Sequence, residues 1–297
     1  MLLGLHNSAV SNPGAHARGF ALTLFGVLVL TPDTLLIRLI DIDPWTMNLW
    51  RGLLMSFSLT VCYLLVARGQ AWAGVKALGL AGVAVAVIYS INAITFVLAI
   101  DHTQVANVLI IIASTPLIAA LLSIIFLKER VALPTWLAIA GAMAGISIVV
   151  GDGARAGTSL GDLLALVTAI ALAVMFIIIR HNKHVNMIPA TAFGALISAL
   201  IAMPFAEPLQ LESAQLGLML LLGLLIMPLS FGLITLGPRS IPAPEVALLL
   251  LLETVLGPIW VWLVIDEKPS ELTIIGGCVV ISAVMLQSIW RLRRNRN

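Results

Sequence analysis

Long apolar runs, separated by short polar stretches, make up most of the chain. Each run is close to the roughly 20 residues that a helix needs to cross about 30 Å of hydrocarbon. The runs lack the alternation of apolar and polar positions found in membrane-barrel strands, so they predict helices. They lie at 19–38, 45–67, 75–99, 104–127, 132–150, 160–180, 188–206, 214–236, 243–264 and 270–290. We therefore expect an all-α polytopic membrane protein with ten transmembrane helices.

Composition excludes the other broad classes. The 297 residues are 61% hydrophobic and 10% charged, with a mean hydropathy of +1.11. A soluble domain carries about 25% charged residues, and a disordered chain has low hydrophobicity, so neither class fits. The net charge of +2 and the dispersed basic residues give no surface for nucleic acid. Cys62 and Cys278 lie in apolar runs without a CxxC motif, so no metal site or disulfide is expected.

Lys and Arg are divided unequally between the two sides that ten spans create. With both termini inside, Arg38, Arg155 and Lys268 fall outside, Arg51 falls within the second span, and the other basic residues fall inside. Cytoplasmic loops carry such an excess of Lys and Arg. We expect an integral protein of the bacterial inner (plasma) membrane with both termini in the cytoplasm. The first apolar run has no small-residue cleavage site, so it is expected to be retained as a span.

The two halves of the chain share polar landmarks at a constant offset. Glu129 and Glu267 are 138 residues apart, and the same offset relates Thr115 to Glu253. Each half holds five expected spans, and an odd number makes the second half cross the membrane in the opposite direction. Inverted repeats of this kind are typical of alternating-access transporters. The expected organisation is a cytoplasmic segment 1–18, repeats at 19–150 and 160–290, and a basic cytoplasmic tail 291–297.

Two stretches of the chain resemble a known family. Ser114-Thr-Pro116, followed by Phe126-Leu-Lys-Glu129-Arg-Val, is similar to the EamA-type repeat of the drug/metabolite transporter (DMT) superfamily. Leu252-Glu253-Thr254 resembles the second copy, although Thr254 stands where proline is usual. The resemblance implies a ten-helix exporter of small metabolites. The YddG-like exporters of aromatic amino acids share this architecture, and these motifs do not separate that branch from the others.

Three charged residues lie well inside the apolar runs, and a charge at the bilayer centre costs at least about 2.5–3.5 kcal/mol. Asp33 and Glu253 are candidates for proton coupling or gating, and for Asp33 a purely structural ion pair is equally compatible. We expect Arg51 to form an ion pair with Asp33, Asp41 or Asp43 near the outer interface, with its long side chain extending towards water.

Uncharged polar and aromatic side chains gather in the third, fourth, eighth and ninth spans. Their spacing predicts a mainly apolar cavity with a few hydrogen-bonding groups, which is typical of small-molecule sites. Hydrogen bonding between membrane helices is the alternative for any one of them. The family resemblance implies that the same four spans line a central cavity. The candidate substrate-binding residues are Tyr89, Asn92, Phe96, Asn107, Ser114, Thr115, Ser230, Phe231 and Trp260.

Prolines and small residues within the spans suggest two further roles. Pro116, Pro228 and Pro258 each remove a backbone donor, so they are candidate hinges for alternating access, with static kinks as the alternative. The fifth span carries Gly141 and Gly145 as a small-xxx-small surface, and the tenth span is its repeat partner. We expect these two spans to brace the bundle or to form a homodimer seam.

No motif in the chain indicates an enzyme. HExxH, the P-loop and the dinucleotide fingerprint are missing, and His181 with His184 lacks further metal ligands, so we expect no cofactor and no metal. The sequence predicts a secondary transporter whose partners are a small-molecule substrate and membrane lipid. Amino acids are the first candidates for export. A broad-specificity drug or metabolite exporter is the alternative, and a non-transporting channel or scaffold is a third class.

Overall fold

The computed structural model describes residues 13–103, 105–151, 159–207, 212–266 and 271–294, and all regular structure within them is helical. Two of the short segments, η2 and η4, are π-helical turns. The elements are α1 (Pro13–Leu30), α2 (Asp33–Ile40), α3 (Pro44–Ala67), η1 (Arg68–Gln70), α4 (Ala71–Lys76), α5 (Gly79–His102), α6 (Val105–Ile112), α7 (Thr115–Leu122), η2 (Ser123–Leu127), α8 (Leu133–Gly151), α9 (Ser159–His181), α10 (Ile188–Ala202), η3 (Met203–Phe205), α11 (Ser213–Leu220), η4 (Leu221–Ile226), α12 (Met227–Leu236), η5 (Gly237–Arg239), α13 (Ala243–Ile265) and α14 (Glu271–Arg294).

Local sequence explains where several helices begin and end. The Asp43 carboxylate accepts hydrogen bonds from the backbone N–H groups of Trp45 and Thr46, both at 2.9 Å, and so caps the start of α3. Asp41 ends α2 and Asp266 ends α13 in the left-handed conformation, with φ of 45° and 61°. Aspartate tolerates this conformation better than most residues do. The acidic turns of the sequence therefore mark helix ends.

Two of the apolar runs are interrupted, which differs from the uninterrupted spans expected from hydropathy. The run 19–38 breaks at Thr31 and Pro32, between α1 and α2. The run 104–127 breaks at residues 113–114, and Pro116 then lies in the first turn of α7. Proline suits the first turn of a helix because the N–H that it lacks has no helical partner there. The apolar pattern could not reveal these breaks because the interrupting residues continue the run.

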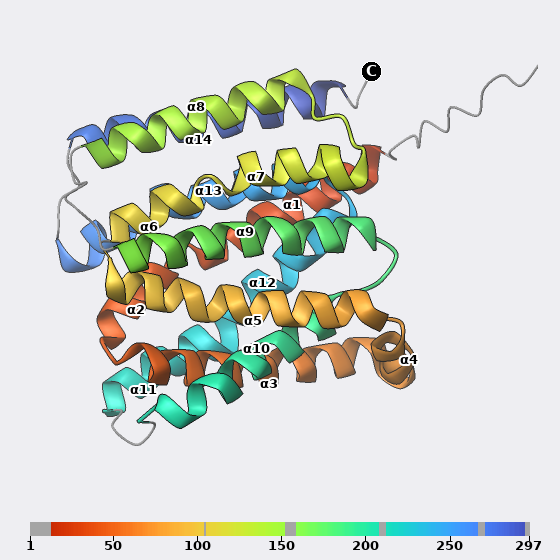
Figure 1. Ribbon diagram of the computed structural model, residues 1–297, viewed down its shortest axis with the longest axis vertical. Coiled ribbons are helices and arrows are strands. Elements are labelled where there is room, and N and C mark those ends of the chain that lie inside the picture. Colours follow the sequence, from red (N-terminus) through yellow and green to blue (C-terminus); the bar gives the residue numbers. More distant parts are fainter. Residues whose placement is uncertain (1–12, 104, 152–158, 208–211, 267–270, 295–297) are drawn as a thin grey trace, which may run out of the picture.

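The helices pack in pairs that join the two halves of the chain. The most extensive contacts between helices of different halves include those of α8 with α14, α5 with α9 and α10, α3 with α10, α1 with α12, and α7 with α13. Figure 1 shows α8 and α14 lying side by side along one edge of the bundle. A Cβ atom on Gly145 of α8 would lie 2.7 Å from the carbonyl oxygen of Gly276 in α14. The small surface expected on the fifth span is therefore covered within the chain, and a homodimer through the remaining faces of these helices stays a prediction.

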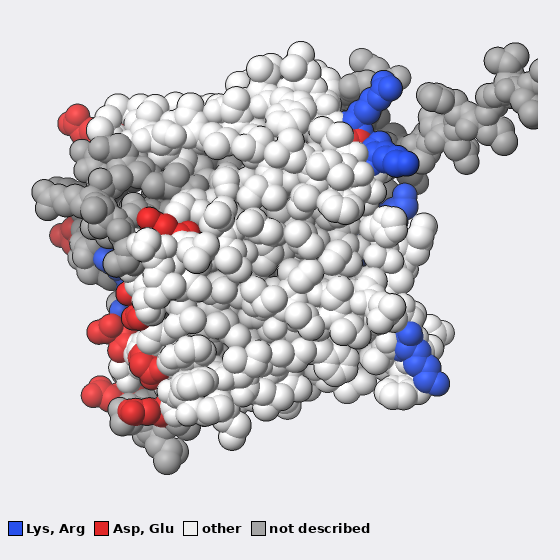
Figure 2. All heavy atoms as spheres, viewed as in Figure 1, with Lys and Arg blue, Asp and Glu red and all other residues white. Residues whose placement is uncertain are grey.

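Seven helical segments are long and apolar enough to cross a membrane, within the part of the chain that the structure describes. Three shorter apolar helices, Thr115–Leu127, Leu133–Ile148 and Ile274–Gln287, coincide with three further runs. Figure 2 shows most Lys and Arg at one end of the molecule, most Asp and Glu at the other, and a broad uncharged band between them. Large apolar side chains such as Leu65, Leu80 and Leu286 are exposed. This surface suits hydrocarbon rather than water.

Candidate substrate cavity

A cavity of about 80 Å³ lies inside the bundle, between the two halves of the chain. Most of its wall is apolar, and its charged side chains among the described residues are Asp33, Arg51 and Glu253. Its amide and hydroxyl side chains, apart from Tyr89, are Asn48, Asn92, Thr115, Thr168, Ser198 and Thr254. Both interrupted runs reach the cavity, because Asp33 begins α2 and Thr115 begins α7. The wall thus combines an apolar lining with a few convergent polar groups.

The cavity is small compared with common ligand pockets. Its 80 Å³ is well below the roughly 300–1,000 Å³ of pockets that enclose drug-sized ligands. A drug-sized ligand would therefore need more room than the cavity offers in this structure.

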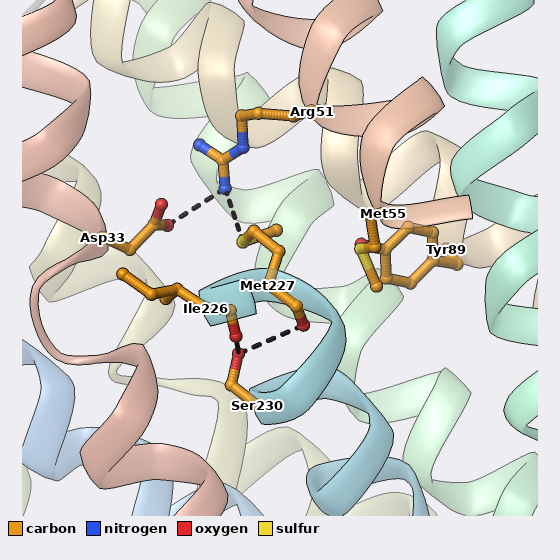
Figure 3. A network of polar contacts seen from close by, with 7 residues as sticks. All are labelled: Asp33, Arg51, Met55, Tyr89, Ile226, Met227 and Ser230. Atoms are coloured by element: carbon orange, nitrogen blue, oxygen red, sulfur yellow. Dashed lines mark hydrogen bonds and ion pairs between the residues drawn. The ribbon is translucent and has the colours of Figure 1, made fainter. Parts of the chain in front are cut away.

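A buried ion pair joins two of the helices in the cavity wall. Nη2 of Arg51 donates to Oδ2 of Asp33 at 3.0 Å and also contacts Sδ of Met227 at 3.3 Å (Figure 3). Asp33, one of the three expected partners of Arg51, thus ties the break after α1 to α3. The expectation that Arg51 extends towards water is wrong, because the residue is only 7% exposed. A partner inside the bundle replaces the hydration that the guanidinium would otherwise seek outside.

The pair uses only part of the bonding capacity of its two groups. Oδ1 of Asp33 and Nη1 of Arg51 are buried and have no hydrogen-bond partner among the described residues. Arginine and carboxylate commonly form two parallel hydrogen bonds, whereas here a single nitrogen meets a single oxygen. An unsatisfied buried polar atom costs about 1–3 kcal/mol, and more when it is charged. One acceptor and one donor of the pair, both on charged groups, thus lack a partner among the described residues.

Aromatic and sulfur groups form the neighbouring part of the wall. The rings of Tyr89 and Phe231 meet edge to face, with centroids 5.4 Å apart and an interplanar angle of 88°. The Tyr89 hydroxyl lies 2.9 Å from Sδ of Met55, its hydrogen-bond acceptor. These contacts join α5, α12 and α3 beside the ion pair, where Figure 3 shows Tyr89 and Met55 together. Methionine adapts its shape easily, so this wall can deform around a bound molecule.

Hydrogen bonds between α5 and α9 form the opposite polar part of the site. Nδ2 of Asn92 donates to the backbone carbonyl of Thr168 at 3.3 Å. The hydroxyl of Thr168 lies 2.7 Å from the hydroxyl of Thr95. Asn92 and Thr168 both line the cavity, so these polar groups hold the two helices together at its edge.

Seven of the fourteen residues predicted for the site line the cavity. They are Asp33, Tyr89, Asn92, Phe96, Thr115, Phe231 and Glu253. The side chains of Asn107 and Pro258 lie outside the described residues, and α13 continues without interruption past residue 258. Pro228 lies in the first turn of α12, directly after the π-helical turn η4, and is outside the cavity wall, as is Pro116.

The remaining three predicted residues bond elsewhere and are outside the cavity wall. The hydroxyl of Ser114 donates to the carbonyl of Ile111, and that of Ser230 donates to the carbonyl of Ile226. Nε1 of Trp260 donates to the hydroxyl of Thr31 at 2.8 Å, at the break between α1 and α2. Serine hydroxyls in helices often bond the preceding turn, and helical spacing alone does not reveal this.

The structure adds wall residues that sequence reasoning did not assign to the cavity. Asn48, Thr168 and Ser198 come from the second, sixth and seventh runs, whereas the expected cavity used the third, fourth, eighth and ninth. Arg51 was noted for its charge but expected at the interface. For Asn48, Arg51, Thr168 and Ser198, the sequence feature that could have indicated a place in the cavity wall was a polar residue within an apolar run.

Ionic and polar contacts connect the helices at the Lys- and Arg-rich end. Nε and Nη2 of Arg180 both lie 2.9 Å from Oε1 of Glu129, and Nη1 of Arg180 donates to the carbonyl of Pro238. His16 of α1 lies 3.6 Å from Glu245 in the first turn of α13. These contacts join α9 and α1 to segments that are distant in the sequence.

The described residues contain no group of three or more His, Cys, Asp and Glu side chains placed to hold a metal ion. The remaining chemistry of the cavity is therefore that of one guanidinium, two carboxylates and neutral hydrogen-bonding groups. Such a set suits the reversible binding of a small molecule.

Long apolar helices around a cavity with buried charges define an integral membrane protein of the transporter class. The chain belongs to the EamA-like transporter family, within the DMT superfamily, because the family model matches residues 17–151 and again 159–289. The resemblance stated from the sequence is thereby confirmed. Members of this family are transporters and not enzymes.

A curated relative and a solved structure are also similar to the chain. The uncharacterized transporter YdfC of Bacillus subtilis (strain 168) is 27% identical over 182 residues. That alignment covers 59% of this chain and 60% of YdfC, so the chain spans about three fifths of its relative. A solved structure described only as a crystal structure of protein has a TM-score of 0.74 and 17% identity. It covers 94% of this chain and 100% of the other, and at this identity it shows the fold alone.

Proposed function

We propose that this chain is a secondary transporter that exports small metabolites from the cytoplasm across the inner membrane by alternating access. Amino acids, including aromatic ones, are the first candidate substrates. The observation that carries this proposal is the cavity itself, where buried charges meet an apolar wall at two interrupted helical runs. Transporters commonly bind substrate where interrupted helices expose backbone and polar groups.

Ten spans arranged as two inverted five-helix repeats complete the proposal. The double family match supports it, and so do the helix pairs. Pairing of α3 with α10, α7 with α13 and α8 with α14 joins equivalent runs of the two halves. The pair α1 with α12 likewise has its counterpart in α9 with α5. An exchange of the two halves maps this set of pairs onto itself, as a two-fold relation requires.

The cavity wall also suggests the chemical character of the substrate. Tyr89, Phe96 and Phe231 offer aromatic surface, while the charged pair offers ionic groups. A small amphipathic molecule with an apolar side chain fits both. The predominance of apolar lining also favours a second candidate function, a broad exporter of amphipathic drugs or metabolites.

Uptake into liposomes that contain the purified protein tests the proposal. A mixture of labelled amino acids is offered with and without a pH gradient, and protein-free liposomes serve as the control. Saturable uptake of a subset is expected, with competition by the unlabelled compound. Saturable transport of drugs or other metabolites alone would favour the second candidate. A linear, non-saturating flux would contradict a carrier and indicate a channel.

A further inference from the structure

We propose that the Asp33–Arg51 ion pair recognises a zwitterionic head group, with a carboxylate at Nη1 of Arg51 and an ammonium at Oδ1 of Asp33. This inference rests on the proposed transport function and specifies its substrate class: α-amino acids with their amino and carboxyl groups both free. The ion pair thus becomes a binding element as well as a link between α2 and α3.

The geometry of the pair suits two opposite charges on one carbon. Nη1 shares its carbon with Nη2, and Oδ1 shares its carbon with Oδ2, so both free atoms flank the single 3.0 Å contact. Figure 3 shows the Arg51 and Asp33 side chains and the single contact that joins them. An α-amino acid carries its carboxylate and its ammonium on the same carbon. It can therefore meet both atoms without breaking the contact between the side chains.

A purely structural ion pair would be expected to satisfy more of its own bonding groups. Buried arginine–carboxylate pairs stabilise a fold only when the remaining lone pairs and protons are also bonded. Here the second contact of Nη2 is the sulfur of Met227, a weak acceptor, and no described residue accepts a hydrogen bond from Nη1. The methionine side chain is flexible and can give way as a ligand enters. The incomplete bonding is thus accounted for by a third, transient partner.

The other charged residue of the cavity distinguishes zwitterions from simple anions. Glu253 adds a second carboxylate to the wall, against the single guanidinium of Arg51. A ligand that carries only a carboxylate would add a third negative charge beside Asp33 and Glu253, against the single positive charge of Arg51. The ammonium group of a zwitterion offsets that added charge. Leu250, Leu251 and Ile234 then offer apolar surface for the side chain of the ligand.

Thermal unfolding of the purified protein in detergent measures this recognition, because a ligand that binds the folded state raises the unfolding temperature. The probes are L-phenylalanine and L-leucine, each compared with its amide, which lacks the carboxylate, and its N-acetyl derivative, which lacks the ammonium. Apparent affinities follow from the dependence of the unfolding temperature on ligand concentration. Both derivatives are expected to bind about tenfold more weakly than the parent amino acid, or worse.

A neutral version of the ion pair provides the second measurement. Asp33→Asn combined with Arg51→Gln keeps a polar side chain at both positions and avoids the unpaired buried charge that either single substitution would leave. This double variant is expected to bind the parent and its two derivatives with similar affinity. The matched control, Glu129→Gln with Arg180→Gln, neutralises an ion pair at the end of the bundle and is expected to retain the discrimination.

The outcomes separate this inference from the proposed function. If neither parent amino acid binds, or if an amide binds as tightly as its parent, zwitterion recognition is overturned, even when liposomes show saturable flux of other metabolites. A double variant that keeps full discrimination also overturns it. If that variant does not unfold cooperatively, the comparison of derivatives on the unaltered protein still decides. Lack of saturable flux for every compound offered would instead contradict the transport function.

Discussion

Asn92 has two roles at the edge of the cavity. Its amide bonds to the carbonyl of Thr168 on α9, and the residue also lines the space proposed for the substrate. A bond between membrane helices contributes about 0.6 kcal/mol on average, which is too little to determine whether the protein folds. The substrate-binding role should therefore dominate the effect of a substitution.

We predict that Asn92→Ala reduces saturable flux by about two- to tenfold, because losing one polar contact to a bound substrate costs about 0.5–1.5 kcal/mol. Membrane abundance should stay close to that of the unaltered protein. Asn182→Ala is the matched control, since the side chain of Asn182 bonds the carbonyl of Ile178 and lies outside the cavity wall. Equal losses of flux and abundance in the Asn92 variant would support a packing role instead.

Glu253 is the carboxylate best placed to couple transport to protons. Asp33 forms an ion pair with Arg51, whereas the side chain of Glu253, in the same cavity wall, makes no hydrogen bond or ion pair with any other described residue. We predict that Glu253→Gln abolishes any dependence of flux on a pH gradient, because the amide cannot carry a proton between the two sides. Liposome uptake with and without the gradient measures this, and Glu271→Gln at the start of α14 is the control. Unchanged gradient dependence in the Glu253 variant would rule out this coupling role.

The individual site residues show how far spacing can predict a cavity. Tyr89, Asn92 and Phe96 share one helical face, and that face does line the cavity. Ser230 and Trp260 also lie in predicted cavity helices, yet they bond Ile226 and Thr31 instead. Periodicity identifies which residues of one helix lie together. It does not identify what that face meets, because this depends on helices far away in the sequence.

At the scale of helices, the sequence predicted the apolar segments well and their interruptions poorly. The break at Thr31 and Pro32 and the break before Thr115 both place polar residues in the cavity wall. Proline was interpreted as a kink within a continuous helix. In the structure Pro116 begins a new helix, because its ring suits a first turn and its missing N–H costs nothing there.

We predict that Gly145→Ala destabilises the protein by about 1–3 kcal/mol, because the added methyl group would press on the Gly276 carbonyl, 2.7 Å away. The unfolding temperature in detergent measures the loss. Gly217→Ala in α11 is the matched control, since a Cβ there meets nothing within 4 Å. That substitution should leave the stability unchanged or raise it by up to about 1 kcal/mol. Similar unfolding temperatures for both variants would contradict close packing between α8 and α14.

The molecule as a whole is polarised by charge. Figure 2 shows most Lys and Arg gathered at one end and most Asp and Glu at the other, although charged residues are scattered along the sequence. Only the basic residues are informative about orientation, because acidic residues contribute little to it. The basic end should therefore face the cytoplasm.

We predict that green fluorescent protein fused after Asn297 fluoresces, whereas alkaline phosphatase at the same point is inactive, because the tail stays in the cytoplasm. A fusion truncated after Glu207, in a turn at the acidic end, should give the reverse pattern and serves as the control. Active phosphatase at the C-terminus would contradict the proposed orientation.

Composition and hydropathy by themselves determined that the chain is helical and membrane-embedded, and the short motifs around Glu129 and Glu253 indicated its family. These properties depend on whether each segment prefers lipid or water, so they can be predicted from the local sequence. Only the tertiary structure decided that Arg51 turns inward to Asp33, that Thr168 and Ser198 reach the cavity, and that α14 covers the glycines of α8. These features depend on contacts between segments that are distant in the sequence. The packing of the whole bundle determines which side chains are buried and which residues they contact.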